Sequence, residues 1–370
     1  MARRIRWAFW GVGAEADAVA ADFAFVPDAE LYAVAAWTQT HAERFAAQHA
    51  IPKCVANLES LLDDPAVDIV YISTPHYRHL EDSLDTLAAG KPLLCEKPFT
   101  LNALQAAQVI DAARDQDLFC MAASWARFMP AVVELKRRVA AGEIGAVRLL
   151  TANLATPEYF DPDSRFFSLD ECGGALLDRG VETIDFACHL LGLPQSISSS
   201  AALGRSGVDD QSTYQLAFDD GALADLSASL RVLGTNEAVV MGEHGQIRLH
   251  APFQRACRFT IRRFESPESS AARSDPTETG FAGRLKTTFK HHAGMQQLRQ
   301  RIDPVLGLLG GDTVHKAFPG NGHQFQIAEA TRCLREGLRE SPVMPLDETL
   351  AIMQIIDAIR GQWGLVYPGE

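Results

Sequence analysis

Short apolar runs alternate with helical segments along the first third of this chain, and this alternation limits the folds open to it. The predicted strands are residues 5–10, 30–37, 67–73, 91–95 and 118–122. The helices predicted between them are residues 15–25, 41–49, 77–89 and 102–116. Strands and helices that alternate at this spacing need right-handed crossovers and a parallel sheet. The sequence therefore predicts a doubly wound α/β domain at the N-terminus.

The pattern changes after a helix predicted at residues 130–141. Six further strands are predicted, at residues 147–155, 211–218, 222–231, 237–241, 246–250 and 258–264. Asp219-Asp220-Gly221 and Glu243-His244-Gly245 have the composition of hairpin turns, which indicates an antiparallel sheet. Helices are predicted at residues 175–191, 323–340 and 346–363. We therefore expect an α/β domain over residues 1–124 and an α+β domain with an open sheet over 125–370, with the last helices packing back on the first domain.

The composition excludes some classes of partner. A net charge of −13 argues against nucleic acid and anionic membranes. The 370 residues contain no apolar run long enough to span a bilayer. The seven cysteines include no CxxC pair and most lie in apolar surroundings, which predicts buried free thiols and a cytoplasmic protein. Residues 266–280 have the composition of a loop, and residues 281–301 form a basic segment that we expect to be a surface helix, a lid or a subunit contact.

A glycine-rich turn follows the first predicted strand. Gly11, Gly13 and Ala14 connect this strand to a helix, where glycines allow a pyrophosphate to approach the backbone and the helix N-terminus supplies N–H donors. Glu15 in the first helical turn would repel a phosphate if it faced inwards, so we expect it to point to solvent. The turn predicts dinucleotide binding.

The ends of the next two strands face the same edge of the predicted sheet. The second strand ends in Trp37 and Thr38, without the acid or arginine that usually contacts the adenosine ribose. Trp37 is predicted to stack on adenine and Thr38 to bond the ribose, or else this is an ordinary exposed loop. Thr74 and Pro75 follow the third strand and should lie over the cofactor. His79, one turn into the next helix, is either a structural histidine or part of the same site.

The fourth of these strand ends carries Cys95-Glu96-Lys97-Pro98. Proline ends the strand because it has no N–H, so Lys97 is presented at the edge where open α/β sheets bind ligands. A lysine close to a nicotinamide cation should lose its proton readily. We therefore predict that Lys97 is an acid/base group.

The helix predicted at 175–191 carries four polar residues at helical spacing. Asp178, Glu182, Asp185 and His189 share one face. Such a face is usually solvated, but the glycines and leucines around the helix start indicate burial. A buried acid near Lys97 predicts an active site, with Asp178 orienting the substrate and Glu182 as an alternative base. A metal site is a minor alternative, because no second ligand cluster accompanies these residues.

The ordered motifs resemble those of the Gfo/Idh/MocA oxidoreductases. They are the glycine turn, Thr74-Pro75-x-x-x-His79, Glu96-Lys97-Pro98 and Gly173-Gly174-x-Leu176-x-Asp178-x-Gly180. Residues 51–53, 94–98, 125–130, 207–210 and 340–346 resemble the dimeric dihydrodiol dehydrogenase branch of that family. The resemblance implies a Rossmann domain followed by an open, mainly antiparallel sheet. It also implies hydride transfer to or from a secondary alcohol of a sugar, polyol or diol, in a homodimer or homotetramer packed through the open sheet faces.

The resemblance further implies which residues contact each ligand. NAD or NADP would be bound by Gly11, Gly13, Ala14, Trp37, Thr38, Thr74, Pro75, His79, Glu96 and Lys97. The substrate would be bound by Trp125, Arg127, Asp178 and Glu182, with Lys97, Asp178 and Glu182 as the catalytic set. No metal is expected.

Three positions depart from the family pattern. Glu182 stands where the family has His or Tyr, the second strand lacks its acid or arginine, and Glu15 replaces an apolar residue. These departures leave two alternatives open. One is a cofactor- or sugar-binding regulator without turnover, with the basic segment at 281–301 as its contact surface. The other is a lyase or hydrolase that uses a tightly held NAD transiently.

Overall fold

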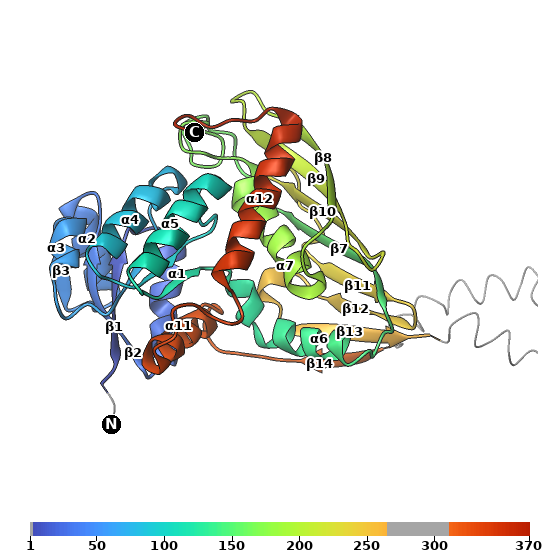
Figure 1. The fold of residues 1–370 in the computed structure, drawn as a ribbon, viewed down its shortest axis with the longest axis horizontal. Helices are drawn as coiled ribbons and strands as arrows, with labels where there is room; N and C mark the ends of the chain where they lie inside the picture. The colour runs from blue at the N-terminus through green and yellow to red at the C-terminus, as the bar shows by residue number, and fades with distance from the viewer. Residues whose placement is uncertain (1–2, 265–310) are drawn as a thin grey trace, which may run out of the picture.

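The structure is a computed structural model that describes residues 3–264 and 311–370. The described part contains two sheets (Figure 1). The segments at 266–280 and 281–301 fall outside it, so the expectations for them remain predictions.

The first sheet has six parallel strands in the order β3-β2-β1-β4-β5-β6. Its strands are β1 (Ile5–Trp10), β2 (Ala29–Ala35), β3 (Lys53–Val55), β4 (Ile69–Ile72), β5 (Leu93–Cys95) and β6 (Cys120–Ala122). The helices are α1 (Ala14–Asp22), α2 (Gln39–Gln48), α3 (Leu58–Leu62), α4 (His79–Ala88) and α5 (Ala103–Asp115), with 3-10 turns at Phe23–Phe25 and His76–Arg78. The order reverses direction between β1 and β4, so right-handed crossovers put α1 and α2 on one face and α4 and α5 on the other.

The second sheet has eight strands in the order β14-β13-β12-β11-β7-β10-β9-β8. Its strands are β7 (Val147–Ala155), β8 (Ser196–Leu203), β9 (Asp209–Ala217), β10 (Leu223–Ser229), β11 (Ala238–Gly242), β12 (Gly245–Leu249), β13 (Arg258–Arg263) and β14 (Asp312–His315). Neighbouring strands are antiparallel, except that β10 runs parallel to β7. Buried and exposed residues alternate along β9, as expected of a sheet covered on one face.

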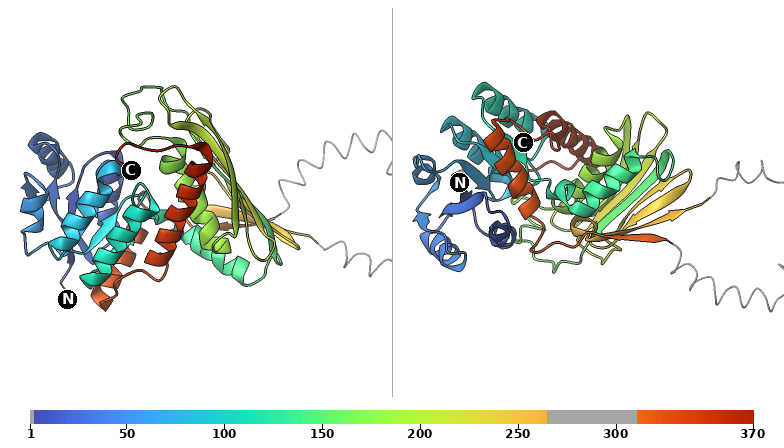
Figure 2. Two further views of the ribbon diagram at one scale, coloured as in Figure 1. Left: turned by 45° about the horizontal axis from the view of Figure 1, so that its top comes forward. Right: turned by 90° about the horizontal axis from the view of Figure 1, so that it is seen from below.

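Helices that follow the first sheet in the chain cover that face. They are α6 (Pro130–Ala140), α7 (Val181–Leu191) and α12 (Leu346–Trp363), while α11 (Gln324–Glu336) packs near β2. Short 3-10 turns lie at Trp125–Phe128 and Phe253–Arg255. The two views in Figure 2 show α12 between the two sheets, where it packs against α5 and β8. Buried apolar side chains form one continuous cluster through both halves. The closing helices therefore hold the halves together and define the space between them.

Most predicted elements are present, and the fold class is confirmed. The helix predicted at 323–340 is shorter, since Gly337 ends it in a left-handed conformation. Four elements were missed, namely β3, α3, β8 and β14. The first two are three and five residues long, too short to show a period. β8 consists mainly of serine and alanine with few large apolar residues, and β14 lies at the sheet edge with three exposed residues.

Candidate active site

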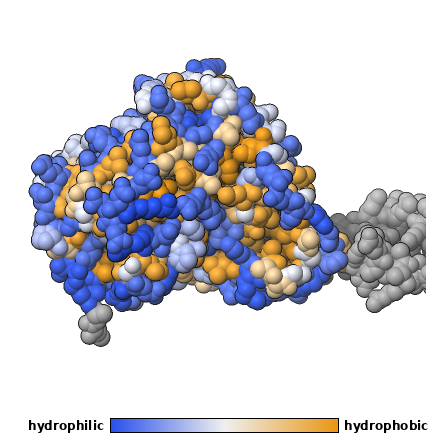
Figure 3. Space-filling model, in the orientation of Figure 1, coloured by the Kyte–Doolittle hydropathy of each residue, from blue (hydrophilic) through white to orange (hydrophobic). Residues whose placement is uncertain are grey.

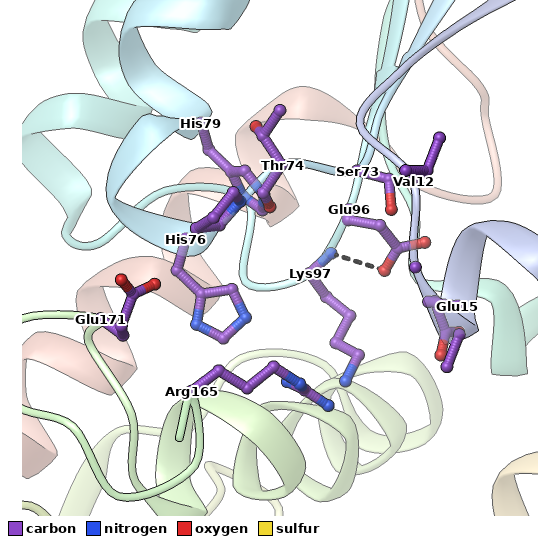
Figure 4. A pocket seen from close by; sticks show the side chains of 13 residues that line it. Val12, Glu15, Ser73, Thr74, His76, His79, Glu96, Lys97, Arg165 and Glu171 are labelled. Atoms are coloured by element: carbon purple, nitrogen blue, oxygen red, sulfur yellow. Dashed lines mark hydrogen bonds between the residues drawn. The ribbon is translucent and has the colours of Figure 1, made fainter. Parts of the chain in front are cut away.

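The C-terminal ends of β1, β4 and β5 surround a cavity of about 250 Å³ between the two halves (Figure 4). Its lining comes from the glycine turn, from the loops after β4 and β5, and from the segment before α7. The lining residues are Val12, Gly13, Ala14, Glu15, Ser73, Thr74, Pro75, His76, His79, Glu96, Lys97, Arg165 and Glu171. This is the edge at which open α/β sheets bind their ligands.

The glycine turn has the form of an anion cradle. Gly11 has φ +95°, and a Cβ there would lie 2.5 Å from the backbone oxygen of Ser73, so only glycine fits. Gly13 is the N-cap of α1, and no side chain caps the helix there. A Cβ at Gly13 would meet nothing within 4 Å, because this face of the turn opens into the cavity. The N–H groups of the first turn of α1 are thus available to an anion, and the turn fits the pyrophosphate of a dinucleotide.

Glu15 does not point away from the site as expected. Its side chain lines the cavity beside Lys97 and Glu96 (Figure 4). Oε1 of Glu15 lies 3.5 Å from Nε2 of His323, at the start of α11. The carboxylate is 46% exposed, which leaves room for water to screen it. Glu15 is therefore exposed to solvent, as expected, but it also borders the cavity, where α11 offers it a partner.

The loop after β4 is held in place by two buried side chains. Oγ1 of Thr74 donates a hydrogen bond to Asp82 at 2.7 Å. The ring of His79 is fully buried, with Nε2 at 2.9 Å from the backbone oxygen of Thr74 and Nδ1 at 2.8 Å from that of Pro98. His79 thus connects the loop after β4 to the loop that carries Lys97. Its ring nitrogens face these two carbonyls, while the ring itself borders the cavity.

Glu96 is buried at the base of the cavity. It accepts hydrogen bonds from the hydroxyl of Tyr71 at 2.6 Å and from the backbone N–H of Lys97 at 3.1 Å. Burial, together with the nearby charge of Glu15, raises the pKa of Glu96 to about 8. A group of this kind binds protons in the neutral range while its position stays fixed by two donors.

Lys97 extends from the end of β5 across the cavity to the second half of the molecule (Figure 4). Nζ donates a hydrogen bond of 2.8 Å to the backbone oxygen of Asp178. It lies 3.6 Å from Oε1 of Glu182 and 4.0 Å from Oδ1 of Asp178. Although burial opposes the charge, the carboxylates of Asp178 and Glu182 raise the pKa of Lys97 above its ordinary value. In this structure Lys97 is therefore an ammonium group.

The helix predicted at 175–191 is not uniform. It begins as a π-helical turn at Leu176–Gly180 and continues as α7. The backbone N–H of Leu176 donates to Asp209 of β9 at 2.9 Å, and Gly180 packs against Tyr214, where a Cβ would lie 2.4 Å from the hydroxyl oxygen. The second sheet thus fixes this turn, which brings the carboxyl groups of Asp178 and Glu182 toward Lys97. Wide turns of this kind often occur at functional sites.

The two carboxyl groups beside Lys97 have opposite electrostatic environments. Asp178 lies 2.9 Å from the guanidinium of Arg165 and 3.4 Å from that of Arg179. These cations and Lys97 outweigh burial and lower the pKa of Asp178 to about 2. Glu182 has Lys97 as its cation, and burial raises its pKa to about 7. Asp178 is thus ionised at neutral pH, whereas Glu182 titrates there.

The other half of the polar stripe on α7 meets different partners. Asp185 binds the guanidinium of Arg127 through contacts of 2.7–3.0 Å, and Nδ1 of His189 lies 3.3 Å from Nζ of Lys136. The stripe is buried along its length rather than solvated. Among residues 3–264 and 311–370, no group of His, Cys, Asp and Glu has the arrangement of a metal site.

None of the four residues predicted to bind substrate is part of the cavity lining. Asp178 and Glu182 lie beside the lining residue Lys97, whereas Arg127 and Trp125 have other surroundings. Arg127 is 1% exposed and binds Asp185, Glu348 and the backbone oxygen of Val343. It is therefore a buried structural cation, which corrects its predicted role. Trp125 is also buried, and its ring packs on that of His323 at 4.5 Å. Motif resemblance does not distinguish a buried pair from a ligand contact.

The adenosine end of the predicted site differs from expectation. Trp37 packs on Trp10 and under the guanidinium of Arg78, and the side chain of Thr38 caps α2 by accepting from the N–H of His41. Neither residue lines the cavities described beside the glycine turn. A second cavity, of about 160 Å³, is lined by His41 and Arg44 of α2 together with Val12, Gly13, Asp17, Phe45 and Gln48.

Several side chains at these cavities were missed from the sequence, among them His41, Arg44, Arg165 and Glu171. His41 and Arg44 lie one and two turns into α2, beyond the strand end where such groups are usually sought. Arg165 and Glu171 come from an irregular segment that carries no periodic signal. The basic residue Arg44, early in the second helix, was the one feature of the sequence that could have indicated a contact with the cofactor.

Two family models match the chain. The NAD-binding Rossmann fold of the Gfo/Idh/MocA oxidoreductase family matches residues 5–124, and the C-terminal domain of the same family matches residues 132–248. Trans-1,2-dihydrobenzene-1,2-diol dehydrogenase of Homo sapiens is 30% identical over 99% of both chains. The enzyme of that name from Mus musculus is 29% identical over the same share.

Solved structures share the fold at lower identity. A levoglucosan dehydrogenase in complex with NADH and levoglucosan has a TM-score of 0.78, with 20% identity over 98% of both chains. An aldose-aldose oxidoreductase from Caulobacter crescentus has a TM-score of 0.77, with 22% identity over 99% of this chain and 100% of the other. The 3-ketoreductase KijD10 from Actinomadura kijaniata, with NADP and TDP-benzene, also scores 0.77, with 21% identity over 97% and 98% of the two chains. These structures share the fold, and the two family models together with the 30% identity to the human enzyme establish that the chain belongs to the Gfo/Idh/MocA family of NAD(P)-binding oxidoreductases.

Proposed function

We propose that this protein transfers a hydride between NAD(P) and a secondary alcohol of a sugar, polyol or diol, with Lys97 as the acid/base at the alcohol oxygen. One observation carries the proposal: Nζ of Lys97 lies in the cavity beside the glycine turn and also bonds the helix that carries Asp178. A ligand oxygen at Nζ would thus meet the cofactor cradle on one side and two carboxyl groups on the other. The relatives described above are enzymes of a dihydrodiol and of sugars, which supports the same substrate class.

The cofactor, when bound, supplies the hydride acceptor or donor. Gly11, Gly13 and the first turn of α1 would hold its pyrophosphate, with Thr74, Pro75 and Glu96 at the nicotinamide end. Lys97 would hold the alcohol oxygen and move its proton. Asp178, fixed by Arg165 and ionised, would orient the hydroxyl groups of the substrate.

The second cavity supports a preference for NADP over NAD. Arg44 and His41 lie beside the glycine turn, at the end of the site where the adenosine ribose would be. No acid is present at the end of β2, where one would bond a ribose 2′-hydroxyl. A guanidinium at this place suits a 2′-phosphate.

The uncovered face of the second sheet supports association of copies in a homodimer or homotetramer. A shallow hollow on this face is lined partly by Leu149, Ser198, Gln215 and Leu223, and Leu223 is 51% exposed. Figure 3 shows apolar residues on both halves of the molecule, including the half that carries this sheet. Sedimentation of the parent and of Leu223→Asp would test it, and a monomeric parent would contradict it.

Two further findings bear on location. None of the seven cysteines, all of which lie in the described part, forms a disulfide, which supports a cytoplasmic protein. Cys257 is exposed, contrary to the expectation that the thiols are buried. Among the described helices, none has the length and apolarity to cross a membrane.

A thermal-shift panel with NAD, NADH, NADP and NADPH, followed by oxidation assays on diols, polyols and sugars, tests the proposal. A ligand that binds the folded state raises the melting temperature. We expect a shift with at least one cofactor pair and absorbance of the reduced nicotinamide with a diol or sugar. Binding without turnover on any substrate would favour a regulator, and a cofactor that copurifies without exchange would favour a lyase or hydrolase.

A further inference from the structure

Glu182 is the side chain beside Lys97 that the proposed function does not yet use. Its Oε1 lies 3.6 Å from Nζ of Lys97, and its side chain is 12% exposed. Its Oε2 is buried and makes no hydrogen bond to any described residue. A buried carboxyl oxygen without a donor is costly as a carboxylate and can hold a proton without losing a bond.

Asp178, the other carboxyl group at Lys97, is not free to take a proton. It accepts from Arg165 and lies close to Arg179, so protonation would break two cation contacts. Glu182 has Lys97 as its sole cationic contact among the described residues. The two carboxyl groups are therefore separated into a fixed anion and a proton-binding group.

We propose that Glu182 accepts a proton from Lys97 when the alcohol is oxidised and returns it in the reverse reaction; this rests on the proposed function. In oxidation, the hydroxyl proton moves to Nζ of Lys97 as one ammonium proton moves to Glu182. The electron pair of the broken C–H bond leaves as hydride to NAD(P)⁺. A carbonyl compound, the reduced cofactor, an ammonium group at Lys97 and a carboxylic acid at Glu182 result, so protons and electrons balance.

Lys97 needs such an acceptor because it is already an ammonium group. The carboxylates around it outweigh burial and raise its pKa, so it has no lone pair to take a hydroxyl proton until one of its own protons leaves. The acceptor must be close and must bind protons near neutral pH. Glu182 meets both conditions at 3.6 Å, whereas Asp178, at 4.0 Å, is held as an anion by Arg165 and fails the second condition.

The charges that face Glu182 come from three elements. Lys97 follows β5, Glu15 lies on α1, and Asp178 and Asp185 flank Glu182 on its own helical segment. Burial raises the pKa of Glu182 to about 7, with Glu15, Asp178 and Asp185 acting in the same direction and Lys97 against it. Oxidation should therefore accelerate as the pH rises through about 7, because the carboxylate form is needed, and carbonyl reduction should slow over the same range.

Infrared difference spectroscopy of the cofactor-free protein tests the proton-binding group directly. The difference between the parent and Glu182→Gln isolates one carboxyl C=O band, which we expect to vanish with a midpoint near neutral pH. Glu59→Gln, an exposed carboxyl on α3, serves as the matched control. A midpoint at the ordinary acidic pKa of glutamate would overturn the proposal without affecting the proposed function.

Kinetics test the transfer itself. Glu182→Gln should lower turnover by about 10²-fold and remove the neutral limb of the pH–rate profile in both directions, while the affinity for cofactor stays unchanged. Glu182→Asp should restore part of the turnover, and its pH–rate profile should still contain a limb near neutral pH. A limb that persists in Glu182→Gln would overturn the relay but leave oxidoreduction intact. Failure of the parent to bind or reduce any dinucleotide would instead overturn the proposed function, and the relay with it.

Discussion

Nζ of Lys97 donates a hydrogen bond of 2.8 Å to the backbone oxygen of Asp178, which lies 81 residues further along the chain. The bond joins the loop after β5 to the π-helical turn before α7, so it connects the two halves of the molecule across the cavity. A change in the relative position of the halves would therefore alter the contact between this ammonium group and Asp178.

Lys97→Met tests the role of the ammonium group. Turnover should fall by about 10²-fold or more, because the alcohol oxygen loses its proton-transfer partner. The cofactor affinity, measured by thermal shift, should change far less. Lys53→Met, on the edge strand of the same sheet, is the control, and equal turnover in Lys97→Met and the parent would exclude the role.

A pair of glycine substitutions separates folding from cofactor binding. Gly11→Ala should lower the melting temperature, because its Cβ would lie 2.5 Å from the oxygen of Ser73 at a φ of +95°. Gly13→Ala meets nothing within 4 Å in an extended conformation, so its melting temperature should be close to that of the parent. Its methyl group stands in the cradle, however, and should raise the Kd for the dinucleotide about tenfold, or about 1.4 kcal/mol. A lowered melting temperature in Gly13→Ala, together with an unchanged Kd for the dinucleotide, would contradict the assignment of this turn as the cofactor cradle.

Arg44→Gln tests the preference for NADP. The Kd for NADP should rise about tenfold, which is typical of one lost charge-assisted hydrogen bond, while the Kd for NAD stays constant. Arg335→Gln, on α11 away from both cavities beside the glycine turn, is a suitable control. An equal loss for both dinucleotides would show that Arg44 does not contact a 2′-phosphate.

Arg127→Met tests whether Arg127 is structural. Removing the guanidinium leaves Asp185 buried without its cation, which should lower the free energy of unfolding by about 3–5 kcal/mol. Arg114→Gln removes an exposed pair and should cost at most about 1 kcal/mol. A stable Arg127→Met with a raised KM would instead restore its predicted role in substrate binding.

Asp209→Asn should change how stability depends on pH. Burial raises the pKa of Asp209 to about 7, so between about pH 4 and pH 7 the unfolded chain releases a proton that the folded protein keeps. The free energy of unfolding therefore falls as the pH rises, by up to about 1.4 kcal/mol per unit from this group. Asparagine still accepts from Leu176 and Ser212 through its oxygen and lacks this dependence.

Chemical denaturation at about pH 5 and about pH 8 measures the difference. Relative to the parent, Asp209→Asn should gain stability at the higher pH. Asp63→Asn, at an exposed position after α3, controls for the change from acid to amide. Parallel pH curves for the parent and Asp209→Asn would contradict the raised pKa.

Much of the fold followed from local pattern. Three elements have the predicted bounds: the strands at Ile5–Trp10 and Val147–Ala155 and the helix at Leu346–Trp363. Each has a long series of regularly spaced apolar residues or is bounded by glycine or proline. β3 and β14 are too short or too exposed to carry such a period. At the site, Lys97, Asp178 and Glu182 were brought together as expected, whereas Arg127 and Trp125 entered the interior instead.

By itself, the sequence determined the alternation of strands and helices, the glycine turn and the order of the family motifs, because these depend on neighbours along the chain. The tertiary structure alone decided that Glu15 faces the cavity, that Arg44 reaches the glycine turn, and that Asp178 and Glu182 differ in pKa. Those outcomes depend on burial and on charges brought together from distant segments. Arg165 reaches Asp178 and leaves Glu182 to Lys97, and this pairing is set by packing rather than by spacing in the chain.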